Sequence, residues 1–175
     1  MKARRERVER GAGLVLRPAG VEDVDGLTAF EELVFHDEPH RIDRQQWRYL
    51  VERGAGEVAV VVDAAGEILG VLVLNHRRGS PNVHVHSIGV HPAARRRGIA
   101  RLLLRRAEAL ARRVGAERLL LEVRRNNRAA IALYRTKGFE PTAVLSSYYG
   151  RGQDGLRMER RLTAPEPAGA EPGRG

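Results

Sequence analysis

The sequence contains no cysteine. A disulfide framework, a thiolate zinc site and a cysteine nucleophile are therefore excluded. The lack of cysteine suits a reducing compartment, and we expect a cytoplasmic protein. No run of about 18 apolar residues is present, so no membrane-spanning helix is predicted. The charged first ten residues are not followed by an apolar segment, so no secretory signal peptide is predicted.

Aromatic residues and lysine are also scarce. Aromatics make up 5% of the chain, and lysine occurs only as Lys2 and Lys137, so the net charge of +9 comes almost entirely from arginine. Such a charge invites a nucleic-acid partner. Single-stranded nucleic acids, however, are usually bound by aromatic side chains that alternate with basic ones. Nucleic acid is therefore not the expected partner, and the charge suits a phosphate-bearing small molecule equally well.

The 175 residues, 42% of them hydrophobic, fit a single folded domain. Residues 1–12 are rich in arginine and glutamate and lack apolar periodicity, whereas residues 163–175 are mainly Pro, Ala, Gly and Glu. We therefore expect a mobile basic segment over 1–12, one domain over 13–162 and a disordered tail over 163–175. The oligomeric state is left open.

Apolar periodicity predicts short strands that alternate with amphipathic helices. Helices are expected over 21–34, 44–53, 98–114 and a short stretch after residue 126. Strands are expected over 14–17, 58–62, 68–74, 83–90, 119–121, 139–149 and 156–162. The continuous apolar run at 119–121 predicts a strand buried on both faces. This order of elements indicates the α/β class with a mixed sheet.

A turn with three arginines precedes the longest predicted helix. Arg95–Arg97 are followed by Gly98, Ile99 and Ala100. A helix N-terminus presents unpaired N–H groups and the positive end of the helix dipole, and Gly98 allows a ligand to approach the backbone closely. The turn is therefore a candidate phosphate site. The alternative is a solvated loop of arginines, but the position between a strand and an amphipathic helix favours phosphate binding.

Two side chains are candidates for acid–base chemistry. Glu122 follows three leucines, where burial would raise the pKa of its carboxyl group toward the range that suits a general base. The alternative for Glu122 is an ion pair with Arg124 or Arg125. Tyr134 lies on the apolar side of the short helix and could protonate a leaving group; the alternative is a packed aromatic whose hydroxyl is satisfied.

The strand that ends at Val90 contains two further features. Gly89 interrupts its apolar pattern, which predicts a bulge or a close backbone approach, and a freed N–H group there could bind a carbonyl oxygen. His84 and His86 share one strand face. Neither they nor the pair His36 and His40 have a third ligand at a suitable spacing, so no metal site is expected.

The stretch from Ser87 to Met158 resembles the GNAT superfamily of acetyl-CoA-dependent N-acetyltransferases. Its phosphate motif, Arg/Gln-x-x-Gly-x-Gly/Ala, matches Arg95, Gly98 and Ala100. Within the superfamily the chain is most similar to the ribosomal-protein N-terminal-alanine acetyltransferases. The residues that carry this similarity are Leu121-Glu122-Val123-Arg124, Asn127, Ala129–Tyr134, Gly138-Phe139, Tyr148-Tyr149, Asp154 and Met158.

The resemblance implies a single domain with a mostly antiparallel mixed sheet and helices on both faces. It also implies acetyl-CoA as cosubstrate, direct transfer of the acetyl group to a primary amine, Glu122 as general base and Tyr134 as general acid. Asn127 would hydrogen-bond the cofactor. The other implied cofactor contacts are Ile88, Gly89 and Val90 on the acetyl-pantetheine arm and Arg95, Arg96, Arg97, Gly98, Ile99 and Ala100 on the pyrophosphate. Tyr148 and Tyr149 would wall the acceptor pocket.

Two departures from the family pattern lie in the regions that would recognise the acceptor. Gln153-Asp154-Gly155 has one carboxylate fewer than the family, and Phe35–Pro39 replaces a Phe-Pro-Trp-like element. Glu122 with Tyr148–Tyr149 favours a protein N-terminal α-amine as the acceptor. The alternatives are a lysine side chain, a polyamine or another small amine. A non-catalytic acyl-CoA sensor or nucleic-acid-binding module is disfavoured by the paired carboxylate and phenol.

Overall fold

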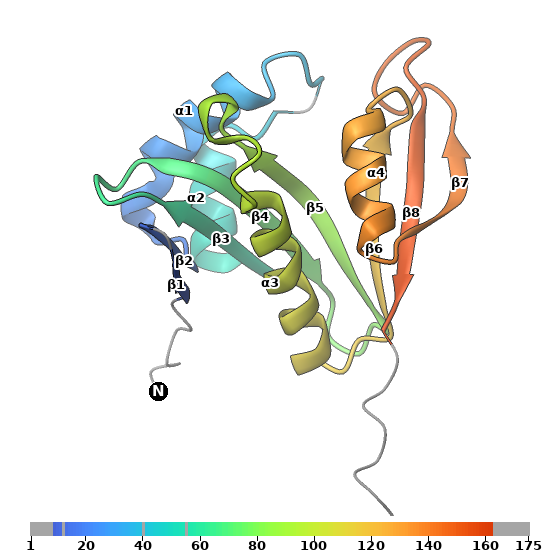
Figure 1. The fold of residues 1–175 in the computed structure, drawn as a ribbon, viewed down its shortest axis with the longest axis horizontal. Coiled ribbons are helices and arrows are strands. Elements are labelled where there is room, and N and C mark those ends of the chain that lie inside the picture. Colours follow the sequence, from blue (N-terminus) through green and yellow to red (C-terminus); the bar gives the residue numbers. More distant parts are fainter. Residues whose placement is uncertain (1–8, 12, 40, 55, 163–175) are drawn as a thin grey trace, which may run out of the picture.

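The computed structural model describes residues 9–11, 13–39, 41–54 and 56–162. Its centre is one eight-stranded sheet with the order β1-β2-β3-β4-β5-β6-β8-β7 (Figure 1). The strands are β1 (Glu9–Gly11), β2 (Leu14–Pro18), β3 (Gly56–Val62), β4 (Ile68–His76), β5 (Asn82–Val90), β6 (Arg118–Arg124), β7 (Glu140–Leu145) and β8 (Gly155–Arg161). β5 and β6 run parallel, and the other neighbours in this sheet run antiparallel. The predicted mixed, mostly antiparallel sheet is confirmed.

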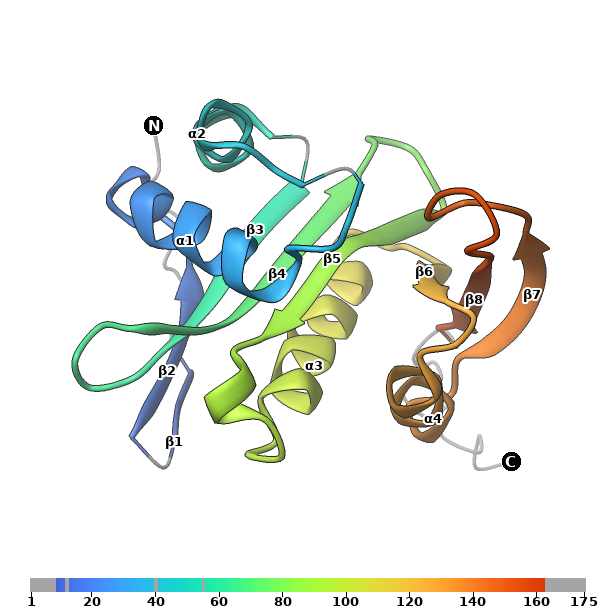
Figure 2. The same ribbon diagram turned by 90° about the horizontal axis from the view of Figure 1, so that it is seen from above.

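Helices cover both faces of this sheet, as predicted (Figure 2). Helices α1 (Val24–Val34) and α2 (Arg44–Arg53) lie on one face, and α3 (Ile99–Arg113) and α4 (Arg128–Thr136) lie on the other. Short 3-10 turns, η1 (Val21–Asp23) and η2 (Pro92–Ala94), precede α1 and the loop before α3. None of the described helices is both long and apolar enough to cross a bilayer.

The apolar run of β4 is buried on both faces, because alternate side chains of a strand point to opposite sides. Leu72 packs into the cluster that contains Leu103 of α3, whereas Val71 packs into the cluster that contains Trp47 of α2. The three layers are therefore joined through the central strands.

β6 differs from the prediction of a strand buried on both faces. Leu119 and Leu121 are buried in the α3-side cluster, but Leu120 is only half-buried. The reason is that α1 and α2 lie over β2–β5 and leave this part of the sheet uncovered (Figure 2). Glu122 shares the uncovered face with Leu120, because the two residues are separated by one position on the strand.

The folded part of the chain begins earlier than predicted. Glu9–Gly11 pairs with β2, so the boundary placed at residue 13 is wrong. Strand pairing at this point uses backbone hydrogen bonds and needs no apolar periodicity, which is why the sequence pattern did not reveal it. The remainder of the predicted mobile segment, residues 1–8 and 12, and the predicted tail, 163–175, lie outside the described residues.

Candidate active site

The predicted site residues gather where β5 and β6 diverge (Figure 1). The parallel ladder between these strands ends at the Val85–Leu121 pair. Its end coincides with a bulge in β5, because two consecutive residues of β4 pair with Val85 and Ser87 and leave His86 as an extra residue. The bulge bends β5 away from β6 at the centre of the sheet.

The bulge lies at His86 and not at Gly89. Gly89 instead provides the alternative that the sequence allowed, a close approach, because a Cβ atom placed there would lie 2.8 Å from Cζ of Phe35. A side chain at this position would therefore displace the rings of Phe35 and Phe30. Gly89 allows these two rings to pack directly against β5.

The diverging part of β5 presents free backbone donors toward β6. His91 N–H donates to the carbonyl of Leu69 on the β4 side at 2.9 Å. Donors alternate along an antiparallel strand, so the N–H groups of Ile88 and Val90 point to the other edge, beyond the end of the ladder with β6. This edge can bind the polar groups of an extended ligand.

The loop before α3 has the backbone shape of an anion site. Gly98 is the N-cap of the fifteen-residue helix and has a φ of 80°, in the left-handed region that favours glycine. No atom lies within 4 Å of the position that a Cβ of residue 98 would take, so the space beside the turn is open. The first N–H groups of α3 have no intrahelical acceptor and carry the positive end of the dipole.

A cavity of about 790 Å³ connects this loop to the free edge of β5. The predicted cofactor residues that line it are Ile88, Gly89, Val90, Arg95, Arg96, Gly98, Ile99, Ala100 and Asn127. Ile99 is only 2% exposed and its side chain belongs to the core, so its contribution to the cavity comes from the backbone. Arg97 is exposed and does not line the cavity, as the solvated-arginine alternative predicted for it.

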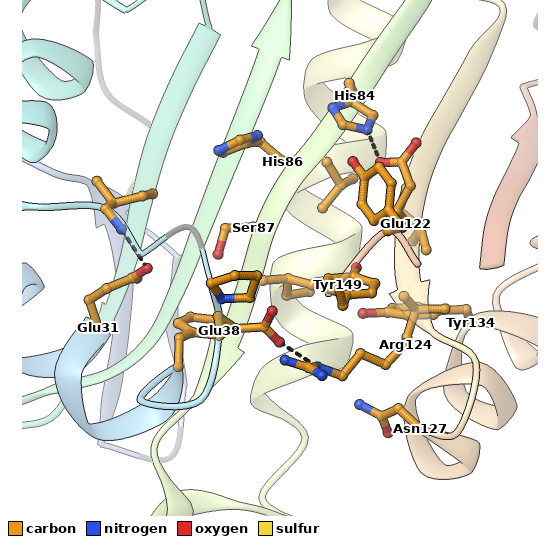
Figure 3. Close-up of a pocket in the computed structure, with 18 residues that line it drawn as sticks. Glu31, Glu38, His84, His86, Ser87, Glu122, Arg124, Asn127, Tyr134 and Tyr149 are labelled. Carbon is orange, nitrogen blue, oxygen red and sulfur yellow. Dashed lines mark hydrogen bonds and ion pairs between the residues drawn. The ribbon is translucent and has the colours of Figure 1, made fainter. Parts of the chain in front are cut away.

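A second cavity, of about 400 Å³, lies next to the first and is hereafter the acceptor cavity (Figure 3). Glu122, Tyr148 and Tyr149 line it, together with side chains from α1 and the loop between α1 and α2. The residues common to both cavities are Phe35, Glu38, Ile88, Arg124, Asn127 and Tyr134. Ile88 and Tyr134 therefore lie where a ligand in one cavity would meet a ligand in the other.

Tyr134 is buried on α4, with 7% of its surface exposed. Its ring packs against Phe139 at a centroid distance of 5.9 Å. Burial raises the pKa of its hydroxyl to about 12, so the group keeps its proton at neutral pH. No described residue forms a hydrogen bond with this hydroxyl. The ring is a packed aromatic, as one alternative predicted, but the hydroxyl is available as a donor at the junction of the cavities.

Glu122 has two side-chain partners, neither of which was predicted. Its Oε2 lies 2.5 Å from Nε2 of His84, and its Oε1 accepts from Nε of Arg157 at 2.9 Å. Burial of the carboxyl group raises its pKa, but the hydrogen bonds from His84 and Arg157 outweigh burial, and the pKa is lowered. The predicted upward shift is therefore wrong. The partners named in the alternative, Arg124 and Arg125, pair instead with Glu38 and Asp154.

Arg124 connects the two loops that border the acceptor cavity. Its Nε donates to Oε1 of Glu38 at 2.8 Å, and its Nη2 donates to the carbonyl of Asp37 at 3.1 Å. The same guanidinium donates to the side-chain oxygen of Gln153 and lies 5.0 Å from the ring centroid of Tyr149. The loop after α1 and the loop between β7 and β8 are thus held together over the cavity.

Asn127 is the N-cap of α4. Its side-chain oxygen accepts from the N–H of Ala130 at 3.1 Å, which leaves the amide NH₂ for a ligand in either cavity. Of the four histidines weighed as metal ligands, His40 lies outside the described residues. No group of three potential metal ligands occurs in the described part of the chain, and the absence of a metal stays a prediction.

The diverging strands, the helix N-terminus beside them and the phenol between two cavities fit a transferase that brings a phosphate-bearing donor and an acceptor together. The model of the acetyltransferase (GNAT) family matches residues 24–139, and the chain belongs to this family. The predicted superfamily is therefore confirmed.

Individual relatives agree with this assignment. The chain is 30% identical over 151 residues to the N-terminal acetyltransferase A complex catalytic subunit ard1 of Schizosaccharomyces pombe, which covers 83% of this chain and 84% of that protein. It is 30% identical over 166 residues to an N-alpha-acetyltransferase of Saccharolobus solfataricus, with coverages of 88% and 96%. The structure of the ribosomal-protein-S18-alanine N-acetyltransferase from Escherichia coli has a TM-score of 0.75 at 22% identity, with coverages of 87% and 97%, and shows the same fold.

Proposed function

We propose that this enzyme acetylates the α-amine of a protein or peptide N-terminus. The observation that carries the proposal is the acceptor cavity, whose volume of about 400 Å³ suits a short chain end. Glu122 and His84 lie at one wall, and Tyr148 and Tyr149 border the same space. The two relatives at 30% identity, which are named as N-terminal and N-alpha-acetyltransferases, support the same acceptor.

Acetyl-CoA supplies the acetyl group as an activated thioester. The residues of the larger cavity fit this molecule, because the open left-handed turn at Gly98 leaves room for a phosphate in front of the α3 N–H groups. Arg95 and Arg96 would add positive charge there. The N–H groups of Ile88 and Val90 would bind the amide-bearing arm along β5, as a neighbouring strand would.

Proton transfer is assigned to the pair formed by Glu122 and His84. An α-amine titrates near pH 8, so much of it is protonated at neutral pH and needs a proton acceptor. Glu122 alone is a weak base, because Arg157 and His84 lower the pKa of its carboxyl group. In the pair, the imidazole accepts the proton and the carboxylate stabilises the resulting imidazolium.

The Tyr134 hydroxyl holds a second proton at the junction of the cavities. Its pKa of about 12 keeps it protonated at neutral pH. A thiolate that leaves at the junction would accept a hydrogen bond and then the proton from this hydroxyl, so Tyr134 is assigned as the general acid.

The acceptor is tested with a peptide that carries both a free α-amine and a lysine. Acetylation is followed by mass spectrometry with fragmentation to locate the modified nitrogen, and a peptide with a blocked α-amine is the control. We expect modification at the α-amine, most rapidly with small first residues. Modification mainly at lysine, or faster turnover of spermidine in a parallel assay, would contradict the proposal. The cytoplasmic location stays a prediction from the sequence.

A further inference from the structure

His86 is a polar residue of the acceptor cavity for which the proposed mechanism has no use. It is the extra residue of the β5 bulge, because Leu74 pairs with Val85 and Val73 pairs with Ser87. Successive side chains of a regular strand point to opposite faces, but a bulge changes this alternation. His86 and Ser87 both line the acceptor cavity, and Figure 3 shows their side chains beside each other on the β5 wall. The bulge therefore directs two consecutive polar side chains into one space.

The imidazole of His86 is accessible from the cavity and is free to bind a ligand. The residue is exposed, and neither ring nitrogen has a hydrogen-bond partner among the described residues. The protein around the ring still desolvates its charged form and lowers the pKa of His86, and nearby His84 acts in the same direction. The ring is therefore neutral at neutral pH, with one nitrogen that donates a hydrogen bond and one that accepts.

The separation of the two histidines of β5 matches the amino end of a peptide. The ring centroids of His84 and His86 are 6.4 Å apart. In the first residue of a peptide, the α-nitrogen and the carbonyl oxygen lie about 3 Å from each other. Each of these atoms forms a hydrogen bond at a heavy-atom distance of about 3 Å. An amine held by the Glu122–His84 pair can therefore have its own carbonyl oxygen within reach of His86.

We propose that His86 donates a hydrogen bond to the carbonyl oxygen of the acceptor's first residue and so favours α-amines over amines that lack an adjacent carbonyl group. This inference rests on the proposed function. Every peptide N-terminus carries this oxygen, whatever its first side chain. The side-chain amine of lysine and the amines of a polyamine do not. His86 would position the peptide backbone, and proton transfer would remain with Glu122 and His84.

The test compares two acceptors that differ only in the first peptide bond. One is a short peptide, and in the other a trans alkene replaces that bond, which keeps the planar shape and removes the carbonyl oxygen. For each enzyme, kcat/KM is measured at saturating acetyl-CoA and equal concentrations of unprotonated amine, and the ratio of amide to alkene is taken. This ratio should be about three- to tenfold lower in His86→Phe than in the wild-type enzyme, because the phenyl ring fills the same space without an N–H donor. The alkene also lacks the peptide N–H, but that loss is common to both enzymes and cancels in the comparison.

Further variants separate hydrogen bonding from a change of shape. His36→Phe is the matched control, because His36 is exposed and does not line the acceptor cavity. It should keep the wild-type ratio. His86→Asn and His86→Gln carry an NH₂ donor near the positions of Nδ1 and Nε2, so one of them should keep most of the wild-type ratio. In a peptide with both an α-amine and a lysine, His86→Phe should also lower the preference for the α-amine.

The outcomes separate this inference from the proposed function. A wild-type enzyme that treats the amide and the alkene alike overturns the inference, even if His86→Phe fails to fold. A folded His86→Phe enzyme with the wild-type ratio also overturns it and leaves α-amine acetylation standing. An equal fall of the ratio in His36→Phe, or its loss in both His86→Asn and His86→Gln, counts against the hydrogen bond in the same way. If neither the peptide nor its variants are acetylated at the α-amine, the proposed function fails and the inference falls with it.

Discussion

Replacing Arg157 with glutamine is expected to shift the acidic limb of the pH–rate profile to higher pH. Nε of Arg157 lies 2.9 Å from Oε1 of Glu122, and it is one of the two donors that lower the pKa of this carboxyl group. Without the cation, the Glu122–His84 pair binds a proton more readily. The active, deprotonated form of the pair then requires a higher pH.

The size of the shift follows from the exposure of Arg157. Its side chain is 45% exposed, so the high-dielectric limit applies even though Glu122 is 8% exposed. Two unit charges about 4 Å apart attract by about 1 kcal/mol in water. At 1.36 kcal/mol per tenfold change in proton affinity, the loss of this attraction should move the acidic limb of the pH–rate profile by less than about one pH unit.

The assay is kcat/KM for an N-terminal peptide across the pH range, at saturating acetyl-CoA. Arg161→Gln is the control, because Arg161 lies on the same strand, is 88% exposed and has no contact with Glu122. The electrostatic reasoning is refuted if the acidic limb of the pH–rate profile does not move in Arg157→Gln, or if it moves to lower pH.

A stability measurement gives an independent check. Because the folded-state pKa of Glu122 is lowered from 4.5, its interactions stabilise the fold above pH 4.5 and this contribution is lost as the pH falls through the folded-state value. Arg157→Gln should therefore melt at a lower temperature than wild type at pH 7, with the difference vanishing in acid. A difference that persists unchanged in acid would show that Arg157 acts through packing.

Three further substitutions test the other parts of the site. Glu122→Gln keeps the side-chain shape but removes the charge, so kcat should fall strongly at pH 7. It should recover in part at higher pH, where the amine deprotonates unaided. Wild-type activity together with lowered thermal stability would contradict a role in catalysis. Tyr134→Phe should lower turnover by roughly a hundred- to ten-thousandfold with unchanged acetyl-CoA affinity, and near-normal turnover would reduce Tyr134 to a packing residue. Gly98→Val should weaken acetyl-CoA binding, measured by calorimetry, more than Gly66→Val does. Gly66 is the control because it has the same left-handed backbone and equally open surroundings but lies away from the cavity. Equal affinities of the two variants would place the phosphate elsewhere.

Features with a local physical cause could be predicted from the sequence. The helix that starts after Gly98 has its apolar residues on one face and ends at Arg113, two residues before the left-handed Gly115, so both its limits were visible in the chain itself. The cap at Asn127 and the strand before Glu122 depend on equally short patterns. Because the cofactor loop, Glu122 and Tyr134 lie at the ends of such elements, they were identified together with them.

Long-range partners could not be predicted in the same way. Glu122 meets His84 across 38 positions and Arg157 across 35, on strands that flank β6 on either side. The leucines before Glu122 indicate burial, which raises the pKa of a carboxyl group. No local pattern indicates which basic side chains of the neighbouring strands contact this carboxyl group. The direction of the pKa shift was therefore wrong although the residue was correctly identified as part of the site.

The junction between the cavities is enclosed by a ring of contacts. The ring runs from Val85–Leu121 along β6 to Arg124, crosses the ion pair to Glu38, and returns to β5 where Phe35 meets Gly89. A closed ring has two mouths and no lateral opening. The two cavities lie on either side of this ring, and ligands held in both would meet inside it. Direct transfer between two ligands held in this way requires no covalent carrier on the protein.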